Sequence, residues 1–169
     1  MQDREQKLQN LINRLEGLIH NISSQEELKI QVIMDVLDKE WSEKPGGISL
    51  SLAECHTIDC IGRNEMFNST AIAKHLNITK GGISKITAKL AKKNMIETYQ
   101  TETNRKEIYF RLKPLGQKVF EIHEKLHKEA VNSIKDALSS YSSDELELVS
   151  GFLKEITAAI MTGKGLQET

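Results

Sequence analysis

Hydrophobic positions recur at helical spacing along both ends of the chain. From residue 28 to 41, from 115 to 138 and from 146 to 160, apolar residues return every three or four positions. Ser24, Gln25, Glu26 and Glu27 have the spacing of a capping box, which predicts that one helix ends near residue 23 and another begins. We therefore expect amphipathic helices at both ends. The first stripe has a period near 3.5 and comprises Leu8, Leu11, Ile12, Leu15, Leu18, Ile19 and Ile22.

The centre of the chain has a shorter pattern. Asn68 precedes apolar residues at helical spacing and is a good N-cap. A break follows at 77–78, and Thr79 then caps a second helix whose apolar face is Ile83, Ile86 and Leu90. Two short helices joined by a tight turn are typical of a helix-turn-helix.

The segment after this second helix alternates in polarity. Residues 95–101 and 107–112 are rich in β-branched and aromatic side chains, and a polar turn separates them. This pattern predicts a β-hairpin, the wing of a winged helix, with its tip near 104–106. Asn94 lies where the helix must stop, and asparagine tolerates the left-handed conformation needed there.

These elements predict a mainly α fold with a small β-hairpin wing. Residues 48–113 would form a winged helix-turn-helix DNA-binding domain, while helices in 1–47 and 114–169 would form a dimerisation region. The alternative for the terminal stripes is a monomeric helical core. We favour a homodimer, because a small winged helix cannot cover so many apolar positions and paired domains at fixed spacing read palindromic DNA.

Charge is segregated along a chain whose net charge is only −1. Residues 74–93 contain six lysines and no carboxylate, a surface suited to a polyanion such as double-stranded DNA. No apolar run approaches the roughly 20 residues of a membrane helix. The start of the chain, MQDREQKLQN, lacks the features of a signal peptide. We expect a cytoplasmic protein without membrane contact.

The central segment resembles the MarR family of bacterial transcriptional regulators. The resemblance is carried by TKGGISKITAKL at 79–90, NRK at 104–106 and LKPLG at 112–116. It implies a dimeric winged-helix regulator, expected to be a repressor, that occupies a palindromic operator. Asn104 and Lys106 stand where the family commonly has Asp and Arg, and Lys113 replaces the usual Thr.

The DNA contacts are predicted from this arrangement. The first turn of the recognition helix should enter the major groove, with Lys85 placed to reach guanine acceptors. The start of the preceding helix should meet phosphate, and the basic wing tip should lie over the minor groove. The candidates are Ser69, Thr70, Thr79, Lys80, Gly81, Gly82, Ser84, Lys85, Lys89, Asn104, Arg105 and Lys106.

The run 123–127 reads HEKLH, which matches the H-E-x-x-H signature of zinc proteases. We reject a metalloenzyme, because nothing else in the chain supports hydrolysis. The zinc-responsive branch of the MarR family places a His-x-x-x-His pair at this point of the long helix. The resemblance implies a further histidine at the position of His56 and a carboxylate from the end of the preceding helix. The candidate Zn²⁺ ligands are His56, His123, His127, Glu40 and Glu54, with Asp38, Glu43 and Cys55 as further donors.

Other interpretations stay open. The histidines can equally be ordinary packed or exposed residues that bind no metal. MarR relatives often bind aromatic anions, and a cleft for a small aromatic or drug-like ligand could be lined by Met34, Trp41, His56 and Ile58. Cys55 or Cys60 could be an oxidation switch, although a buried thiol is the better interpretation of each. A winged helix that has lost DNA binding and contacts protein instead is the remaining rival.

Overall fold

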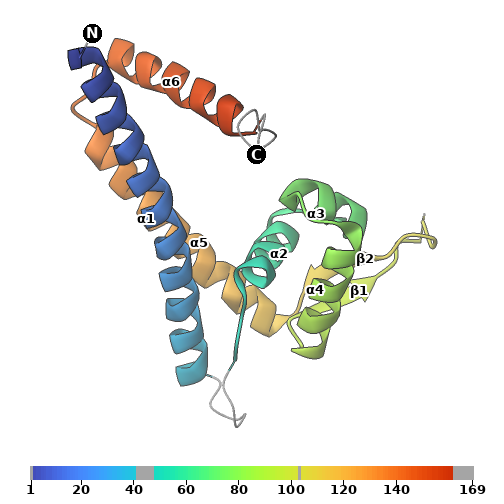
Figure 1. The fold of residues 1–169 in the computed structure, drawn as a ribbon. Helices are drawn as coiled ribbons and strands as arrows, with labels where there is room; N and C mark the ends of the chain where they lie inside the picture. The colour runs from blue at the N-terminus through green and yellow to red at the C-terminus, as the bar shows by residue number, and fades with distance from the viewer. Residues whose placement is uncertain (1, 41–47, 103, 162–169) are drawn as a thin grey trace. The chain divides into compact units, whose positions relative to one another are not determined.

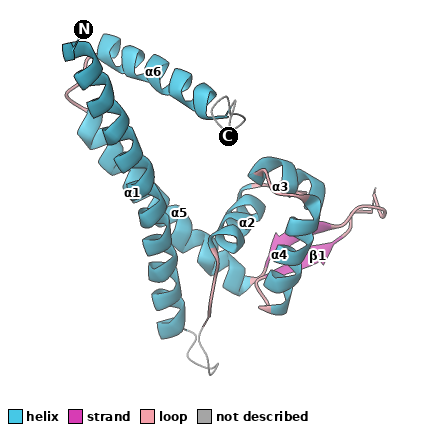
Figure 2. Cartoon of the chain, in the orientation of Figure 1, coloured by secondary structure: helices cyan, strands magenta, loops and turns pink. Residues whose placement is uncertain are grey.

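A computed structural model of the chain describes residues 2–40, 48–102 and 104–161. These residues form a mainly helical fold with a two-stranded antiparallel wing, as the sequence predicts (Figures 1 and 2). The chain divides into two compact units, residues 1–127 and 128–169. The elements are α1 (Gln2–Glu40), α2 (Leu52–Arg63), α3 (Ser69–Leu76), α4 (Lys80–Lys92), β1 (Ile96–Tyr99), β2 (Tyr109–Leu112), α5 (Pro114–Leu138) and α6 (Ser143–Met161).

The predicted break near residue 23 is wrong, because α1 is one continuous helix. Ser23 and Ser24 donate their hydroxyls to the carbonyls of Ile19 and His20, each at 3.2 Å. An exposed serine can bond back to the preceding turn as well as cap a new helix, so the motif alone does not require a break. Residues 41–47, where the proline and glycines of the sequence predict the end of this helix, lie outside the described residues.

The helix caps predicted at Asn68 and Thr79 and the helix end predicted at Asn94 are confirmed. Ser51 and Glu54 form a capping box at the start of α2, and Asn68 and Thr79 cap α3 and α4. Asn94 has a φ of 63°, the left-handed conformation expected after the recognition helix. These bonds satisfy backbone N–H groups in the first turn, which have no partner within the helix. Because the capping residue lies only three positions away, helix starts can be predicted from the sequence.

The hydrophobic core lies in the first unit. It gathers the last third of α1, the inner faces of α2, α3 and α4, the wing and the start of α5. α2 lies at its centre, with Ile58 fully buried between the other elements. The core residues without solvent exposure include Ile33, Leu37, Ile58, Ile72, Ile83, Leu90, Met95 and Val119.

The wing is a short hairpin in which Ile96 pairs with Leu112 and Tyr99 pairs with Tyr109. Both strands are shorter than the sequence indicates. Side chains opposite one another also interact, since Arg111 donates to Glu97 at 2.6 Å. The hairpin therefore packs buried side chains on the core, and the Arg111–Glu97 pair links its two strands on the more exposed side.

Gly116 is the point at which α5 meets the winged helix. A Cβ at this position would lie 2.0 Å from the carbonyl oxygen of Met95, which precedes β1. Lys113, just before α5, donates its backbone N–H to the same oxygen at 2.9 Å. No side chain fits here, so the glycine of the LKPLG sequence is needed for close backbone contact.

We expect Gly116→Ala to destabilise the protein by about 2 kcal/mol or more, because backbone atoms must shift to make room. Urea unfolding measures the change. Gly17→Ala is the matched control, since nothing lies within 4 Å of a Cβ there. It should stabilise α1 by about 0.5–1 kcal/mol through helix propensity. Equal unfolding midpoints for the two variants would contradict the contact at Gly116.

The second unit contains the rest of α5 and α6. Ser142 and Glu145 form the predicted capping box, with the Ser142 N–H donating to Glu145 at 2.8 Å. No helix within the described ranges is both long and apolar enough to span a membrane. Several large apolar side chains of α5 and α6 are exposed: Ile134, Leu138, Leu146, Leu148, Val149, Leu153 and Ile160.

Candidate nucleic-acid interface and metal centre

The helix-turn-helix is formed by α3, a tight turn and α4. Asn77 adopts the left-handed conformation with a φ of 52°, and the N–H of Ile78 donates to the carbonyl of Ala73 at 3.0 Å. Thr79 then accepts the N–H of Gly82 at 3.1 Å. Because one face of α4 is buried through Ile83 and Leu90, its opposite face points outward.

The two glycines at the start of α4 serve different purposes. A Cβ on Gly82 would lie 2.9 Å from a methyl group of Ile78, so the capped turn itself requires a glycine. A Cβ on Gly81 would meet nothing within 4 Å. The fold itself therefore does not require a glycine at position 81, where the missing side chain leaves the backbone accessible to a partner. Both glycines, with exposed Thr79, Lys80 and Ser84, remain predicted DNA contacts.

The basic face of α4 is smaller than the sequence indicates. Lys85, Lys89 and Lys92 are exposed and share one face at spacings of four and three residues. Lys93, in contrast, turns into the fold and donates to Glu54 at 2.7 Å and to the carbonyl of Ser49 at 2.7 Å. The last lysine of the run therefore holds the end of α4 against the start of α2.

The wing tip presents two exposed cations, Arg105 and Lys106. Asn104 accepts the backbone N–H of Lys106 at 3.2 Å, while Gln100 donates to the carbonyl of Arg105 at 2.7 Å. Asn104 is half-buried and its side chain stabilises the turn. The structure thus gives Asn104 a turn-forming role, and Arg105 and Lys106 remain the outward-facing candidates.

Glu107 joins the wing to the start of α3, a role that the sequence did not reveal. Its carboxylate accepts from Asn68 at 2.7 Å and from the Tyr109 hydroxyl at 3.1 Å. Thr70 is exposed and Ser69 is half-buried beside this junction. The predicted phosphate contacts of α3 and the wing are therefore carried by one hydrogen-bonded framework.

Three metal-ligating side chains from separate elements converge in the first unit. Glu26 of α1, His56 of α2 and His123 of α5 place donor atoms within 4.8 Å of one another. The Nε2 of His56 lies 3.6 Å from a Glu26 oxygen, and the two imidazole rings stand edge to face with centroids 6.2 Å apart. Donors bound to one tetrahedral zinc at about 2.0–2.1 Å lie roughly 3.4 Å apart, so small side-chain movements suffice.

The predicted ligands are brought together only in part. His56 and His123 meet, whereas Glu54 is occupied by Lys93 and the capping box. His127 is exposed one turn further along α5 and is not in the cluster of described residues. The side chain of Glu40 lies outside the described set. The carboxylate comes instead from Glu26, near the middle of α1.

The sequence carried a signal for Glu26 that periodicity reveals. Glu26 lies four, seven and eleven residues before Ile30, Ile33 and Leu37, which form the buried face of α1. An acid on an otherwise apolar face requires a partner. Burial raises the pKa of Glu26, but hydrogen bonds from Lys29 and His56 outweigh this effect and hold the pKa below its usual value. The carboxylate is therefore ionised at neutral pH.

Next to the cluster, Asp59 contacts the Nδ1 edge of the His123 ring. Its Oδ1 lies 3.2 Å from His123 Nδ1, and Arg63 Nε donates to both oxygens at 3.0 and 2.9 Å. Burial raises the pKa of Asp59, but hydrogen bonds from His123 and Arg63 overcome it and lower the pKa to about 2. Asp59 is a permanent anion next to a ring that is 8% exposed.

The cysteines are free and buried, as expected for packed thiols. Burial, assisted by the nearby Glu54 charge, raises the pKa of Cys55 to about 12. Burial and the Asp59 charge raise the pKa of Cys60 to about 11. Both thiols stay protonated at neutral pH, so neither has the thiolate character of an oxidation switch.

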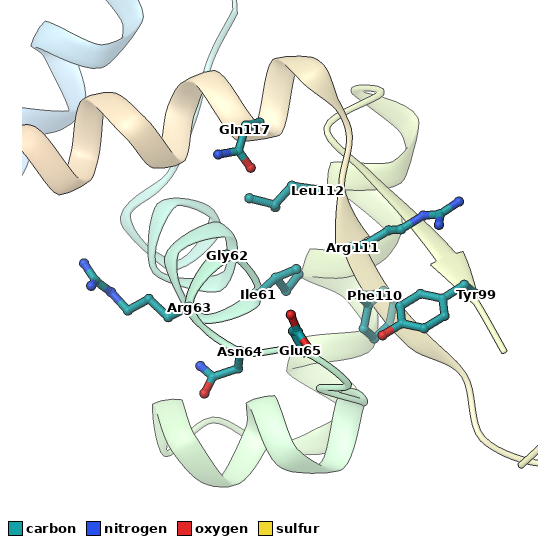
Figure 3. Close-up of a pocket in the computed structure, with 10 residues that line it drawn as sticks. All are labelled: Ile61, Gly62, Arg63, Asn64, Glu65, Tyr99, Phe110, Arg111, Leu112 and Gln117. Carbon is teal, nitrogen blue, oxygen red and sulfur yellow. The ribbon is translucent and has the colours of Figure 1, made fainter. Parts of the chain in front are cut away.

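A pocket of about 550 Å³ lies between the end of α2, the wing and the start of α5 (Figure 3). Ile61, Phe110 and Leu112 line it, and Figure 3 shows Arg63 and Arg111 extending away from its centre. Arg63 is paired with Asp59 on the same helix, and Arg111 is paired with Glu97 on the neighbouring strand. None of the described residues of the expected aromatic-ligand cleft lines this pocket, and Trp41 lies outside the described residues.

Comparison with known proteins agrees with this geometry. Residues 50–108 match the sequence pattern of the MarR family. The chain is 36% identical over 135 residues to the HTH-type transcriptional regulator PchR of Bacillus subtilis, covering 79% of this chain and 80% of PchR. The chain belongs to the MarR family. It is therefore a helix-turn-helix transcriptional regulator and not an HEKLH protease.

Solved structures share the MarR fold. FabT of Streptococcus pneumoniae, solved in complex with DNA, superposes with a TM-score of 0.62 at 21% identity, covering 89% of this chain and 99% of FabT. The zinc-dependent MarR regulator AdcR, solved in its zinc-bound state, gives a TM-score of 0.56 at 19% identity over 85% of this chain and 97% of AdcR. These similarities establish the fold.

The Glu54–Lys93 ion pair should make stability depend on pH. Burial raises the pKa of Glu54, but hydrogen bonds from Lys93 and Ser51 lower it overall. A lowered native pKa contributes stability above pH 4.5, the ordinary value, and this stability is lost as pH falls through the native pKa. Glu54→Gln should cost about 1–3 kcal/mol at pH 7, because Lys93 loses its partner.

Urea unfolding of wild type and Glu54→Gln between pH 7 and pH 3 measures this difference. The gap between the two proteins should narrow below pH 4.5. Glu27→Gln on the exposed side of α1 makes the same charge change and should differ little from wild type throughout. A gap that stays constant over this range would show that Glu54 acts through packing alone.

Proposed function

We propose that this MarR-family protein binds a palindromic DNA operator as a homodimer and represses transcription from it. The observation that carries the proposal is the exposed face of Lys85, Lys89 and Lys92 on α4, beside the basic wing tip at Arg105 and Lys106. In a winged helix, a cationic recognition helix is suited to a major groove and a cationic wing tip to an adjacent minor groove. The DNA complex of FabT supports the same use of this fold.

A second copy of the chain is the proposed partner of the terminal helices. Leu18, Ile19, Ile22 and Leu28 of α1 are each more than half exposed in the single chain. Apolar side chains in such a continuous stripe favour an oligomeric interface. A twofold dimer would present two recognition helices to two half-sites, which is how a short winged helix gains both affinity and specificity.

The effector that we propose is a divalent metal ion such as zinc. Two imidazoles and an ionised carboxylate form a suitable donor set, and the histidine pair with an acid is typical of zinc sites. His127 lies one turn beyond His123 on the same face of α5 and can supply a fourth donor by a change of rotamer. The zinc-bound state of AdcR supports this choice.

Bound metal would link α1, α2 and α5. Each donor lies on a different helix, so the ion stabilises the arrangement in which all three helices approach. Any change in the angle of α5 relative to the winged helix alters that arrangement, and DNA and metal would bias the same equilibrium. The small-molecule alternative has less support, because the arginines beside the wing pocket point away from its centre (Figure 3).

The DNA proposal predicts that Lys85→Ala and Arg105→Ala each weaken binding by about 1–3 kcal/mol, since each removes a groove contact. Affinity is measured by fluorescence anisotropy on a palindromic duplex selected by the wild type from a random pool. In the double variant the two losses should add approximately, because the two contacts lie in different grooves.

Lys154→Ala, on exposed α6, is the control for this experiment and should bind like wild type. Sedimentation of each variant shows whether it remains a dimer. Wild-type affinity in the double variant would overturn the contact map, while weak binding that ignores salt would overturn DNA as the partner.

The metal proposal predicts about one zinc per chain in protein never exposed to chelator, measured by elemental analysis after adding zinc and desalting. His123→Ala and Glu26→Gln should lose most of this metal, because each removes one donor. His20→Ala, an exposed histidine of α1, should retain it. Absence of stoichiometric zinc in the wild type would remove the metal hypothesis and leave the DNA proposal intact.

A further inference from the structure

We propose that Asp59 is a positioning residue that holds the His123 ring with its proton on Nδ1 and its Nε2 free to face Glu26 and His56. The inference rests on the proposed metal function, but its central statement concerns the ring itself. A neutral histidine carries its proton on either nitrogen, and the partner of one nitrogen decides the state of the other. Asp59 is such a partner, at the Nδ1 edge of His123.

The contact geometry identifies that edge. The Oδ1 of Asp59 lies 3.2 Å from His123 Nδ1, and the side chain of His123 is 10% exposed. An ionised carboxylate can accept a hydrogen bond but cannot donate one, so the proton must lie on Nδ1. The lone pair of the neutral ring is then on Nε2, the nitrogen that a metal ion would use.

Asp59 is itself held in place. Arg63, one turn later on α2, donates its Nε–H to both carboxylate oxygens at 3.0 and 2.9 Å. The guanidinium also lies 5.7 Å above the centre of the Phe120 ring and reaches Glu124 at 3.8 Å. Phe120 and Glu124 flank His123 on α5, so this arginine fixes the carboxylate relative to the helix that carries the ring.

Two residues of α2 have different roles: His56 offers a donor atom to the proposed metal ion, and Asp59 orients the His123 ring. His56 and Asp59 lie three residues apart and therefore share a face, which lets one offer a donor atom while the other contacts the back of His123. Among described residues, the group whose donors converge contains Glu26, His56 and His123 but not Asp59. Asp59 is thus assigned to orienting a ligand and not to binding the ion.

An orienting carboxylate of this kind raises the basicity of the ring and removes the entropy cost of fixing it. Loss of such a partner typically reduces metal affinity about 10–100-fold. We expect Asp59→Asn to lower zinc affinity by that factor. Its amide can donate as well as accept, so it no longer forces the proton onto Nδ1.

Two measurements on the full chain test the proposal. The first is nitrogen-15 NMR of the imidazole in metal-free protein at a pH where the ring is neutral, with the His123 signals assigned by their loss in His123→Ala. Wild type should show protonated Nδ1, and Asp59→Asn should shift population to protonated Nε2. The second is competition between protein and a chromophoric chelator for zinc, which gives the affinity of each variant.

Asp35→Asn is the matched control. Asp35 is an exposed acid of α1 that accepts from Gln31 at 2.8 Å, and its substitution makes the same change in charge. It should leave both the His123 ring state and zinc affinity unchanged. If Asp59→Asn does not fold, Arg63→Gln loosens the same carboxylate from its anchor and should shift the ring population in the same direction.

The outcomes separate this proposal from the proposed function. An unchanged ring state in Asp59→Asn, or protonated Nε2 in the wild type, would overturn the assignment of Asp59. Zinc affinity equal to wild type in a variant with a changed ring state would also overturn it as a positioning residue for metal. Failure of the wild type to bind zinc would remove the metal function, while the ring state would still decide the structural assignment.

Discussion

The contact between Gly116 and the carbonyl of Met95 determines where α5 lies against the winged helix. With no Cβ in the way, the first turn of α5 approaches the backbone just before β1. A second glycine contact follows, because a Cβ on Gly62 of α2 would lie 2.5 Å from the Phe120 ring. Two close approaches one turn apart leave α5 little freedom to rotate, so Val119 enters the core and His123 faces α2.

α2 connects the two functional regions of the first unit. At its start, Glu54 binds Lys93 and so holds the C-terminal end of the recognition helix. Two residues later His56 faces Glu26, and about one turn beyond it Asp59 contacts His123. Its remaining face, with Ile58 and Ile61, is buried in the core. Because packed interiors deform little, a short helix held by contacts to both candidate sites is expected to move as a rigid body.

Local features of the fold could be predicted from the sequence because their causes lie within a few residues. Ser51, Asn68 and Thr79 cap helices through bonds to N–H groups three residues away, and Asn94 ends α4 for an equally local reason. The error at Ser24 has the same origin. The Ser24 hydroxyl can either cap a new helix or donate to the carbonyl of His20 in the preceding turn. The long apolar face of α1 favours the second hydrogen bond, which is compatible with a continuous helix.

The candidate sites depended on contacts that local pattern does not contain. His56 and His123 could be named from sequence, but the choice of carboxylate is made by how α1 packs on α2, far along the chain. Likewise, nothing near Lys93 in the sequence distinguishes it from Lys92. It leaves the basic face only because the end of α4 lies beside the buried Glu54. Tertiary packing therefore decided which charged groups bind partners and which stabilise the fold.

Charge in the histidine cluster limits what can occupy it. Glu26 and Asp59 are both ionised, and the cations Lys29 and Arg63 already compensate them from the outer side. The Glu26 carboxylate lies beside both rings, where it attracts a cation and repels an anion. An ion present at 100 times its dissociation constant would stabilise this convergence by about 2.7 kcal/mol. Coupling between sites is typically about 1–3 kcal/mol, so the proposed ion, if held by three helices, would be sufficient to change the affinity of the proposed dimer for DNA.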